Sequence, residues 1–224
     1  MQKILNIIRS YKGKVKEKKT LKSQFKIYID KSLLFIHIPK AAGVSIHKSL
    51  YNTDSPGHLT ALYYKSHFSP KKWNSLYKFT FVRDPYTRLY SAYNYLRKGG
   101  RGRFIDIKYQ RYLAQFDSFE DFVINGLHEA IEKNMQHFKP QYSMLIDESG
   151  RLLVDYVGKF ETINDDFKKV QTLAKLKKVV ELEHFNSSKN AKDELINNFS
   201  ENMYPIINHF YKEDFEIFHY SKKS

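Results

Sequence analysis

The chain has 224 residues, of which 42% are hydrophobic and 16% aromatic, so it can bury the core of one domain of ordinary size. This composition excludes a wholly disordered protein. The chain contains no cysteine, which excludes a disulfide scaffold, a cysteine nucleophile and a thiolate metal site, and suits a reducing compartment. Its 38 Lys and Arg residues against 24 Asp and Glu give a net charge of +14, which favours polyanionic partners such as nucleic acid, anionic membranes, or sulfated and phosphorylated ligands.

The N-terminal residues are rich in lysine, with six lysines and one glutamate between Lys12 and Lys22. We therefore expect a basic arm over residues 1–30, followed by a domain over residues 31–224. The apolar stretch Ile4–Ile8 is far shorter than the ~20 residues that span a bilayer. A peripheral membrane contact through the arm remains an alternative to a solvated arm.

The first expected core element is a strand at Leu33–Ile38, a nearly continuous apolar run of the kind that is buried on both faces of a parallel sheet. Pro39 ends this run. Gly43 opens a turn, and a short helix is expected over Val44–Tyr51.

The loop between that strand and helix carries a candidate anion site. Main-chain N–H groups of the loop and of the first helical turn lack partners, and the helix dipole favours negative charge there. Lys40 adds a mobile charge, Ser45 adds a hydroxyl donor, and Gly43 permits close approach of the backbone. The order differs from a Walker A loop, because the lysine precedes the glycine by three residues. An ordinary strand–helix turn with an exposed lysine explains this motif alone equally well.

A second strand, turn and helix follow. The apolar run Tyr77–Val82 predicts a strand, Asp84 is a good N-cap, and Pro85 stands where helices tolerate proline. The helix carries apolar residues at helical spacing, namely Leu89, Ala92, Tyr93 and Leu96. Two strand–turn–helix units indicate an α/β fold in a single domain, with a central parallel sheet flanked by helices.

Arg83 lies at the end of the second strand, where ligands bind in open α/β sheets. Asp84, Arg88 and Ser91 share one stripe of the helix, and we expect an Asp84–Arg88 ion pair that fixes orientation. Arg83 and Ser91 together are suited to a phosphate group. A capped helix with a structural salt bridge is the competing interpretation.

The later elements are less sharply marked. Residues Phe119–Leu127 predict a helix, Asp147–Gly150 a turn, and Leu152–Phe160 contains a strand. A helix is expected after Thr162, a short strand at Val179–Leu182, and a helical tail over Asp193–Phe218 that is interrupted at Pro205.

The two motifs together resemble those of sulfotransferases that use 3′-phosphoadenosine 5′-phosphosulfate (PAPS), especially the heparan, chondroitin and dermatan branch and its bacterial relatives. The loop from Phe35 to Ser45 resembles the 5′-phosphosulfate loop, and Arg83-Asp84-Pro85 with Arg88 and Ser91 resembles the 3′-phosphate motif. Further similar blocks extend the resemblance over about residues 32–220: Gly57–Ala61, Asp155–Glu161, Phe185–Lys189 and Tyr211–Tyr220. The resemblance implies a P-loop-like sulfotransferase fold.

The resemblance also implies which residues bind the nucleotide: Lys40, Ala41, Ala42, Gly43, Val44, Ser45, Arg83, Ser91, Asn186 and Ser188. Ala41 and Val44 stand where the family usually has threonine, so two hydroxyl donors are missing. Lys159 stands where arginine is frequent. Tyr and Phe are abundant, at 17 each, but the sequence does not indicate which ring stacks on adenine.

Two residues are implied to act in catalysis. Lys40 would neutralise the leaving phosphate oxygen, as positioned cations do in phosphoryl transfer. His58 would be the general base, because it lies in the segment that carries the catalytic histidine of related enzymes. His37, in the buried strand, and His67 are the alternatives. No metal is implied, since no cluster has ligand spacing.

The expected activity is transfer of a sulfuryl group from PAPS to a hydroxyl of a carbohydrate or glycolipid. The alternatives are a P-loop-like nucleotide-dependent kinase and a basic nucleic-acid-binding protein, although no recognised nucleic-acid motif is present.

The basic loop Arg97–Arg103 is either an acceptor-binding loop for an anionic sugar or headgroup, or a solvated loop. Composition and the absence of an anchor favour a bacterial cytoplasmic enzyme, with membrane association through the arm as an option. The acceptor and the oligomeric state are not indicated.

Overall fold

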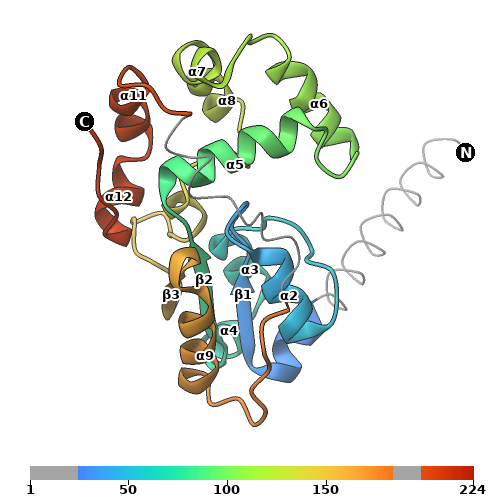
Figure 1. Cartoon of the computed structure of the whole chain (residues 1–224). Coiled ribbons are helices and arrows are strands. Elements are labelled where there is room, and N and C mark those ends of the chain that lie inside the picture. Colours follow the sequence, from blue (N-terminus) through green and yellow to red (C-terminus); the bar gives the residue numbers. More distant parts are fainter. Residues whose placement is uncertain (1–24, 184–197) are drawn as a thin grey trace, which may run out of the picture.

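Three parallel strands lie at the centre of the structure, a computed structural model that describes residues 25–183 and 198–224 (Figure 1). β1 (Leu33–Ile36) pairs with β2 (Tyr77–Val82), which pairs with β3 (Tyr156–Lys159), so β2 is central. The parallel sheet predicted from the two apolar runs is confirmed, and β2 has the predicted bounds. β1 ends two residues early, at Ile36.

Helices account for most of the remaining described chain. Before the basic loop they are α2 (Gly43–Tyr51), α3 (Ala61–His67), α4 (Pro70–Ser75) and α5 (Pro85–Arg97). After it come α6 (Phe104–Leu113), α7 (Phe119–Asp121), a π-helical segment (Phe122–Gly126), α8 (Leu127–Glu132), 3-10 turns (Tyr142–Met144 and Phe160–Thr162), α9 (Ile163–Leu173), α11 (Met203–Phe210) and α12 (Lys212–Phe218).

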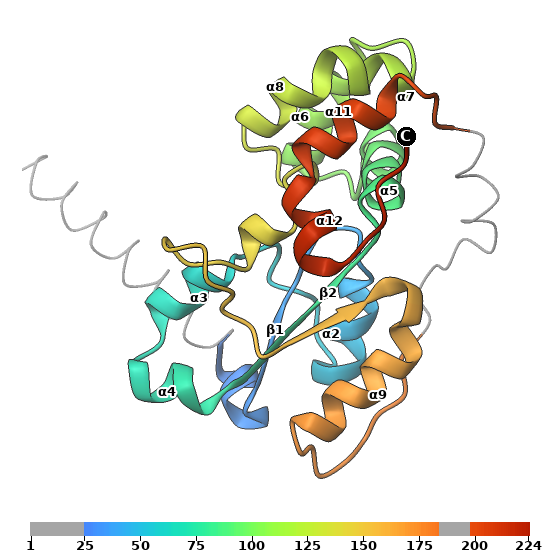
Figure 2. The same ribbon diagram turned by 90° about the vertical axis from the view of Figure 1, so that its left-hand side faces the viewer.

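The sheet is covered on both faces. α2 and α9 lie on one face, and α3 and α4 lie on the other (Figures 1 and 2). All four residues of β1 are buried, and five of the six residues of β2 are buried, which is why both strands read as continuous apolar runs. The sheet and its helices form one hydrophobic cluster, and a second cluster joins α5 to the helices that follow it.

α5 connects these two clusters. It begins directly after β2 and crosses above the carboxyl ends of the strands, with α6, α7, α8 and α11 on its far side (Figure 1). Its predicted start is confirmed, because the Asp84 side chain accepts a hydrogen bond from the Thr87 N–H and Pro85 is the first helical residue. This arrangement places the first turn of α5 at the edge of the sheet where ligands bind.

Residues 25–31 form a helical segment that packs on the sheet. Phe25 and Tyr28 are buried in the same cluster as β1, and the Tyr28 hydroxyl lies 3.1 Å from Nε2 of His47. The packed part of the chain therefore includes residues before position 31. Residues 1–24, which make up most of the expected basic arm, lie outside the described residues.

Two expectations for the later elements are wrong. Residues 179–182 form no strand, because the Gln171 side chain takes the place of a strand partner and bonds both the N–H and the carbonyl of Val180. Pro205 does not interrupt the helical tail. It lies in the first turn of α11, where a missing N–H costs nothing, and the chain breaks at Tyr211 instead.

Candidate functional site

The two strand-end motifs meet at one edge of the sheet. Lys40 follows β1 and Arg83 follows β2, and parallel strands present their carboxyl ends on the same side. The Arg83 guanidinium donates a hydrogen bond from Nη1 to the main-chain carbonyl of Lys40, at 3.4 Å. The cations of both motifs thus belong to one cluster of side chains.

The loop after β1 has the conformation of an anion-binding turn. Lys40 and Ala42 both have positive φ, at 67° and 59°, and such a left-handed alternation turns successive N–H groups to one side. Each such residue costs on the order of 1–3 kcal/mol, and such strain is concentrated at ligand sites. Ala42 is the N-cap residue of α2, and its side chain accepts no hydrogen bond. The main-chain N–H groups in the first turn of α2 therefore have no capping side chain as acceptor. Ser45, in that turn, is buried, whereas Val44 is exposed.

Gly43 has a structural role that the sequence did not indicate. A Cβ atom at this position would lie 1.8 Å from Cδ2 of His37, so the absence of a side chain makes room for the histidine ring. His37 is buried, its Nδ1 lies 2.6 Å from the Ser55 hydroxyl, and burial holds its pKa well below the usual value. His37 is therefore a neutral histidine that is fixed within the structure.

Lys40 lies in a cationic and partly buried environment. Its Nζ is 4.1 Å from the centre of the Tyr95 ring, on α5. Burial, followed by the charges of Arg83 and Arg101, lowers its pKa to about 8. Within residues 25–183 and 198–224, neither Lys40 nor Arg83 forms an ion pair. A cation cluster without bound carboxylates is suited to an anionic ligand.

Arg83 is held by groups that the sequence did not indicate. Its Nε donates to the Thr87 hydroxyl at 2.9 Å, and its guanidinium lies 4.4 Å from the centre of the Phe160 ring. The Gln141 amide bonds both the N–H and the carbonyl of Arg83, at 2.9 and 2.8 Å. Thr87 thus makes the contact to Arg83 within α5, while Ser91 is half-buried one turn further along.

The expected Asp84–Arg88 ion pair is wrong. Arg88 is fully buried, and its two terminal nitrogens donate to the carbonyls of His137 and Lys139, at 3.0 and 2.8 Å. Asp84 instead uses its carboxylate to cap α5. The physical reason is burial: an enclosed guanidinium needs hydrogen-bond acceptors, and two carbonyls of one loop serve its terminal nitrogens, while Nε has no partner among the described residues.

His58 lies against the first motif. Its Nδ1 is 3.3 Å from the carbonyl of His37, and the two rings are in edge contact at 4.4 Å between centroids. Burial lowers the pKa of His58 to about 4, with the charges of Arg103 and Lys40 acting in the same direction. His58 is therefore neutral at pH 7. If Nδ1 donates to the carbonyl, Nε2 carries the lone pair that a general base needs.

His67, the remaining alternative, lies apart from this cluster. It is exposed on α3, and it stacks on the Tyr63 ring of its own helix at 4.1 Å. Asn186 and Ser188, the last two of the expected nucleotide-binding residues, lie outside the described residues.

His137 is a member of the cluster that sequence reasoning missed. It follows α8, and its ring lies 5.2 Å from that of His58 and 5.4 Å from that of Tyr95. It is 8% exposed, and burial lowers its pKa to about 3. No spacing pattern marked it, because it lies in an irregular segment and reaches the site only through contacts with residues far away in the chain.

Within the described parts of the chain, no three His, Asp or Glu side chains are arranged to hold a metal ion. None of the described helices combines the length and the apolar character needed to cross a membrane.

Comparison with known families decides the class of this protein. The sequence model of the sulfotransferase family matches residues 23–221. The chain belongs to the sulfotransferase family. In this sulfotransferase the matched range contains all three strands, both strand-end motifs and the histidine cluster. Comparisons with curated proteins and with solved structures gave no match. The α/β architecture with a parallel sheet flanked by helices agrees with the family.

Proposed function

We propose that this sulfotransferase takes its sulfuryl group from PAPS and transfers it to a hydroxyl of a carbohydrate or glycolipid. The observation that supports this proposal is the contact of the Arg83 guanidinium with the main chain of Lys40, which brings the charge of Arg83 close enough to act on the Lys40 ammonium. PAPS has two anionic ends, a 5′-phosphosulfate and a 3′-phosphate. Two neighbouring cationic groups that form no ion pair with any described residue are the complement of such a ligand.

The residues present fit a phosphosulfate group. The donors are the main-chain N–H groups of residues 40–45, the Lys40 ammonium and the Ser45 hydroxyl. Ala41 and Val44 offer no hydroxyl, so the contact relies on the backbone, whose left-handed turns at Lys40 and Ala42 preorganise it. When bound, PAPS would supply the activated sulfuryl group.

Lys40 would stabilise the charge that develops on the phosphate oxygen as the sulfuryl group leaves it. At pH 7 a lysine with a pKa of about 8 is mostly protonated, so it is ready to act as a cation. Its partly buried position makes this interaction stronger than it would be in water. Contact with the Tyr95 ring leaves its three N–H donors available, because a π-face is not a hydrogen-bonding carboxylate.

His58 would remove the proton from the acceptor hydroxyl. The carbonyl of His37 orients its ring through Nδ1, which is the arrangement that fixes one tautomer and leaves Nε2 as the base. Burial, and then the neighbouring cations, lower the pKa of His58 and keep it unprotonated in the free enzyme. A bound anionic nucleotide would offset those cations and make His58 a stronger base, at the stage when a base is needed.

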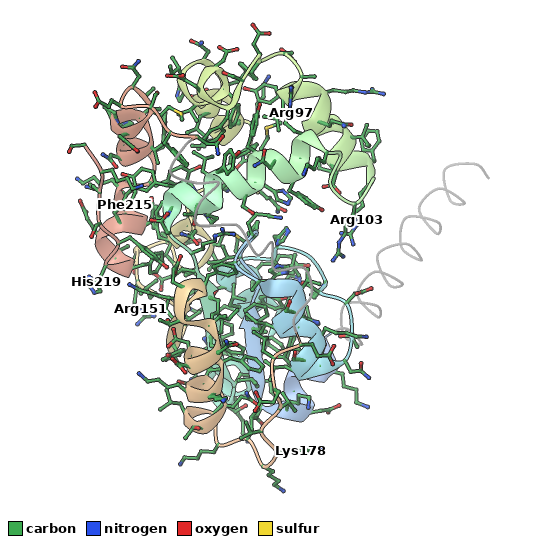
Figure 3. All side chains as sticks on the ribbon, viewed as in Figure 1. Arg97, Arg103, Arg151, Lys178, Phe215 and His219 are labelled. Atoms are coloured by element: carbon green, nitrogen blue, oxygen red, sulfur yellow. The ribbon has the colours of Figure 1, made fainter. Side chains whose placement is uncertain are left out.

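The acceptor would approach from the side of the basic loop. Arg103 is exposed and projects from the loop before α6 toward the half of the molecule that contains α2 (Figure 3). The charge of Arg103 acts on His58, and that of Arg101 acts on Lys40. Arg101 donates its main-chain N–H to Asp106, and neither guanidinium forms an ion pair with a described residue. We therefore propose that this loop receives an acceptor with an anionic sugar or headgroup.

A ligand comparison tests the donor directly. Purified protein should be stabilised against thermal unfolding by adenosine 3′,5′-bisphosphate (PAP), the product of PAPS, and not by ATP with magnesium. It should also transfer labelled sulfate from PAPS to a member of a glycan panel. Stabilisation by ATP with magnesium alone would support the kinase alternative. Salt-sensitive binding to random duplex DNA that PAP does not compete would support the nucleic-acid alternative.

A further inference from the structure

His137 contacts two rings of the site, those of His58 and Tyr95, and the function proposed above gives it no role. Its ring makes edge contact with the ring of His58, the proposed base, at 5.2 Å and 79°. It stacks on Tyr95, at 5.4 Å and 26°, and the Lys40 ammonium lies over that same tyrosine. His137 therefore contacts the base directly and is one ring away from the lysine that faces the leaving group.

The backbone around His137 is fixed by buried polar groups of the second motif. Arg88 donates to the carbonyls of His137 and Lys139, and the Gln141 amide bonds the main chain of Arg83 twice. A fully buried guanidinium is costly to place in a protein interior, and here both its terminal nitrogens hold one irregular segment. The segment that carries His137 is thereby tied to the helix and the strand end of the 3′-phosphate motif.

One nitrogen of the His137 ring has no hydrogen-bond partner among the described residues. Nδ1 is completely enclosed and has no hydrogen-bond partner in the described structure. The ring is neutral, because burial and then the charges of His58, Lys40 and Arg88 oppose its protonation, so it carries a single hydrogen. An enclosed N–H without an acceptor is rarer than an enclosed acceptor without a donor. The hydrogen is therefore placed on Nε2, so the ring that contacts His58 carries a neutral donor.

We propose that His137 is a hydrogen-bond donor of the reaction site, whose Nε2–H contacts an oxygen of the sulfuryl group during transfer. This inference rests on the proposed function. No bond to His137 forms or breaks, and it neither gains nor loses a proton. It stabilises negative charge on the sulfuryl oxygens without adding another cation to a cluster that already holds Lys40 and Arg83. Its contact with His58 places it next to the path between the base and the leaving group.

The test replaces the donor while it keeps the ring. His137→Phe retains an aromatic ring to stack on Tyr95 and lacks the N–H, whereas His137→Gln has an amide N–H that reaches the position of Nε2. We expect His137→Phe to lower kcat by about 10²–10³, the usual cost of one oxyanion donor. His137→Gln should restore part of that loss. His128→Ala, which removes an exposed histidine on α8, is the matched control and should retain kcat.

Binding measurements identify the contacted group. PAP lacks the sulfuryl group, so His137→Phe should bind PAP as the wild type does and bind PAPS more weakly. Equal losses for PAP and PAPS, with no rescue by His137→Gln, would show a structural or phosphate-binding role and overturn the proposal. Loss of the acidic limb of the pH profile in His137→Gln would identify His137 as the base, which also overturns it. A wild-type protein that binds neither PAP nor PAPS would instead refute the proposed function itself.

Discussion

The Arg83 guanidinium donates a hydrogen bond to the main-chain carbonyl of Lys40, although 43 residues separate them in the chain. This contact exists because β1 and β2 are neighbouring parallel strands, so that the residues after each strand emerge side by side. It ties the backbone of the first motif to the side chain of the second. The pairing of β1 with β2 therefore holds the loop that carries Lys40 next to Arg83.

Removing the Lys40 ammonium should abolish most of the activity. We expect Lys40→Ala to lower kcat by about 10²–10³, because a cation that stabilises the leaving oxygen acts mainly in the transition state. Steady-state sulfate transfer from labelled PAPS measures the effect. Lys48→Ala, in the last turn of α2, removes the same charge away from the strand-end cluster and should retain activity. Near-normal turnover of Lys40→Ala would contradict the role assigned to this lysine.

The pH dependence of kcat/KM should have limbs displaced from the usual histidine and lysine values. Below about pH 4 His58 becomes protonated and can no longer accept a proton, and above about pH 8 Lys40 loses its charge. We therefore expect kcat/KM to be constant between these pH values. Circular dichroism at each pH checks that the protein stays folded.

Lys40→Arg provides the control for the alkaline limb. A guanidinium stays protonated in proteins, so this variant should move the alkaline limb upward and leave the acidic limb in place, even if its turnover is lower. A single acidic limb near pH 6.5 in the wild type would show that the base lies outside the buried histidine cluster.

Gly43→Ala should destabilise the protein through a steric clash. The new Cβ would lie 1.8 Å from Cδ2 of His37, so one of the two must shift, at a cost of about 1–3 kcal/mol or more. Urea unfolding measures this loss. In a His37→Ala background the clash is absent, so Gly43→Ala should cost much less there. Equal costs in the two backgrounds would mean that the His37 ring does not occupy this space.

Mild acid should weaken the fold through the buried histidines. His37, His58 and His137 all have pKa values below the ordinary 6.5, because burial disfavours their charged forms. Below pH 6.5 the unfolded chain takes up protons that the folded chain does not. The free energy of unfolding should then fall by up to about 1.4 kcal/mol per pH unit for each histidine.

Urea titrations between pH 7 and pH 4.5 test this dependence. His137→Phe should flatten the slope by the contribution of one histidine, and the difference from the wild type isolates that residue from the titrating carboxylates. His128→Ala serves as the comparison, because His128 is exposed. An unchanged slope in His137→Phe would show that His137 takes up its proton equally in both states.

Much of the fold followed from short stretches of sequence. Tyr77–Val82 is an uninterrupted apolar run because β2 is covered on both faces, and its bounds were predicted to the residue. Asp84 and Pro85 marked the start of α5, since capping depends on residues a few positions apart. Lys40 and Arg83 were found in the same way, as charged residues at the ends of apolar strands.

The site beyond those residues depended on contacts that no local pattern encodes. Arg88 was assigned to Asp84, four residues away. Its two terminal nitrogens instead donate to carbonyls of the segment 137–139, which lies beside the buried guanidinium only in the folded chain. The space that Gly43 leaves for the ring of His37 was not indicated by the sequence. His137 had no marker in the sequence.

The sequence by itself determined the parallel α/β core, the two cationic strand ends and the family, because apolar runs, caps and ordered motifs are properties of neighbouring residues. Only the tertiary structure decided which side chains face one another at that edge of the sheet. Three histidines 21 and 79 residues apart form one neutral cluster beside Lys40, as the ring contacts of His37, His58 and His137 show. Such a cluster arises from burial and long-range packing, which set the pKa values that the chemistry needs.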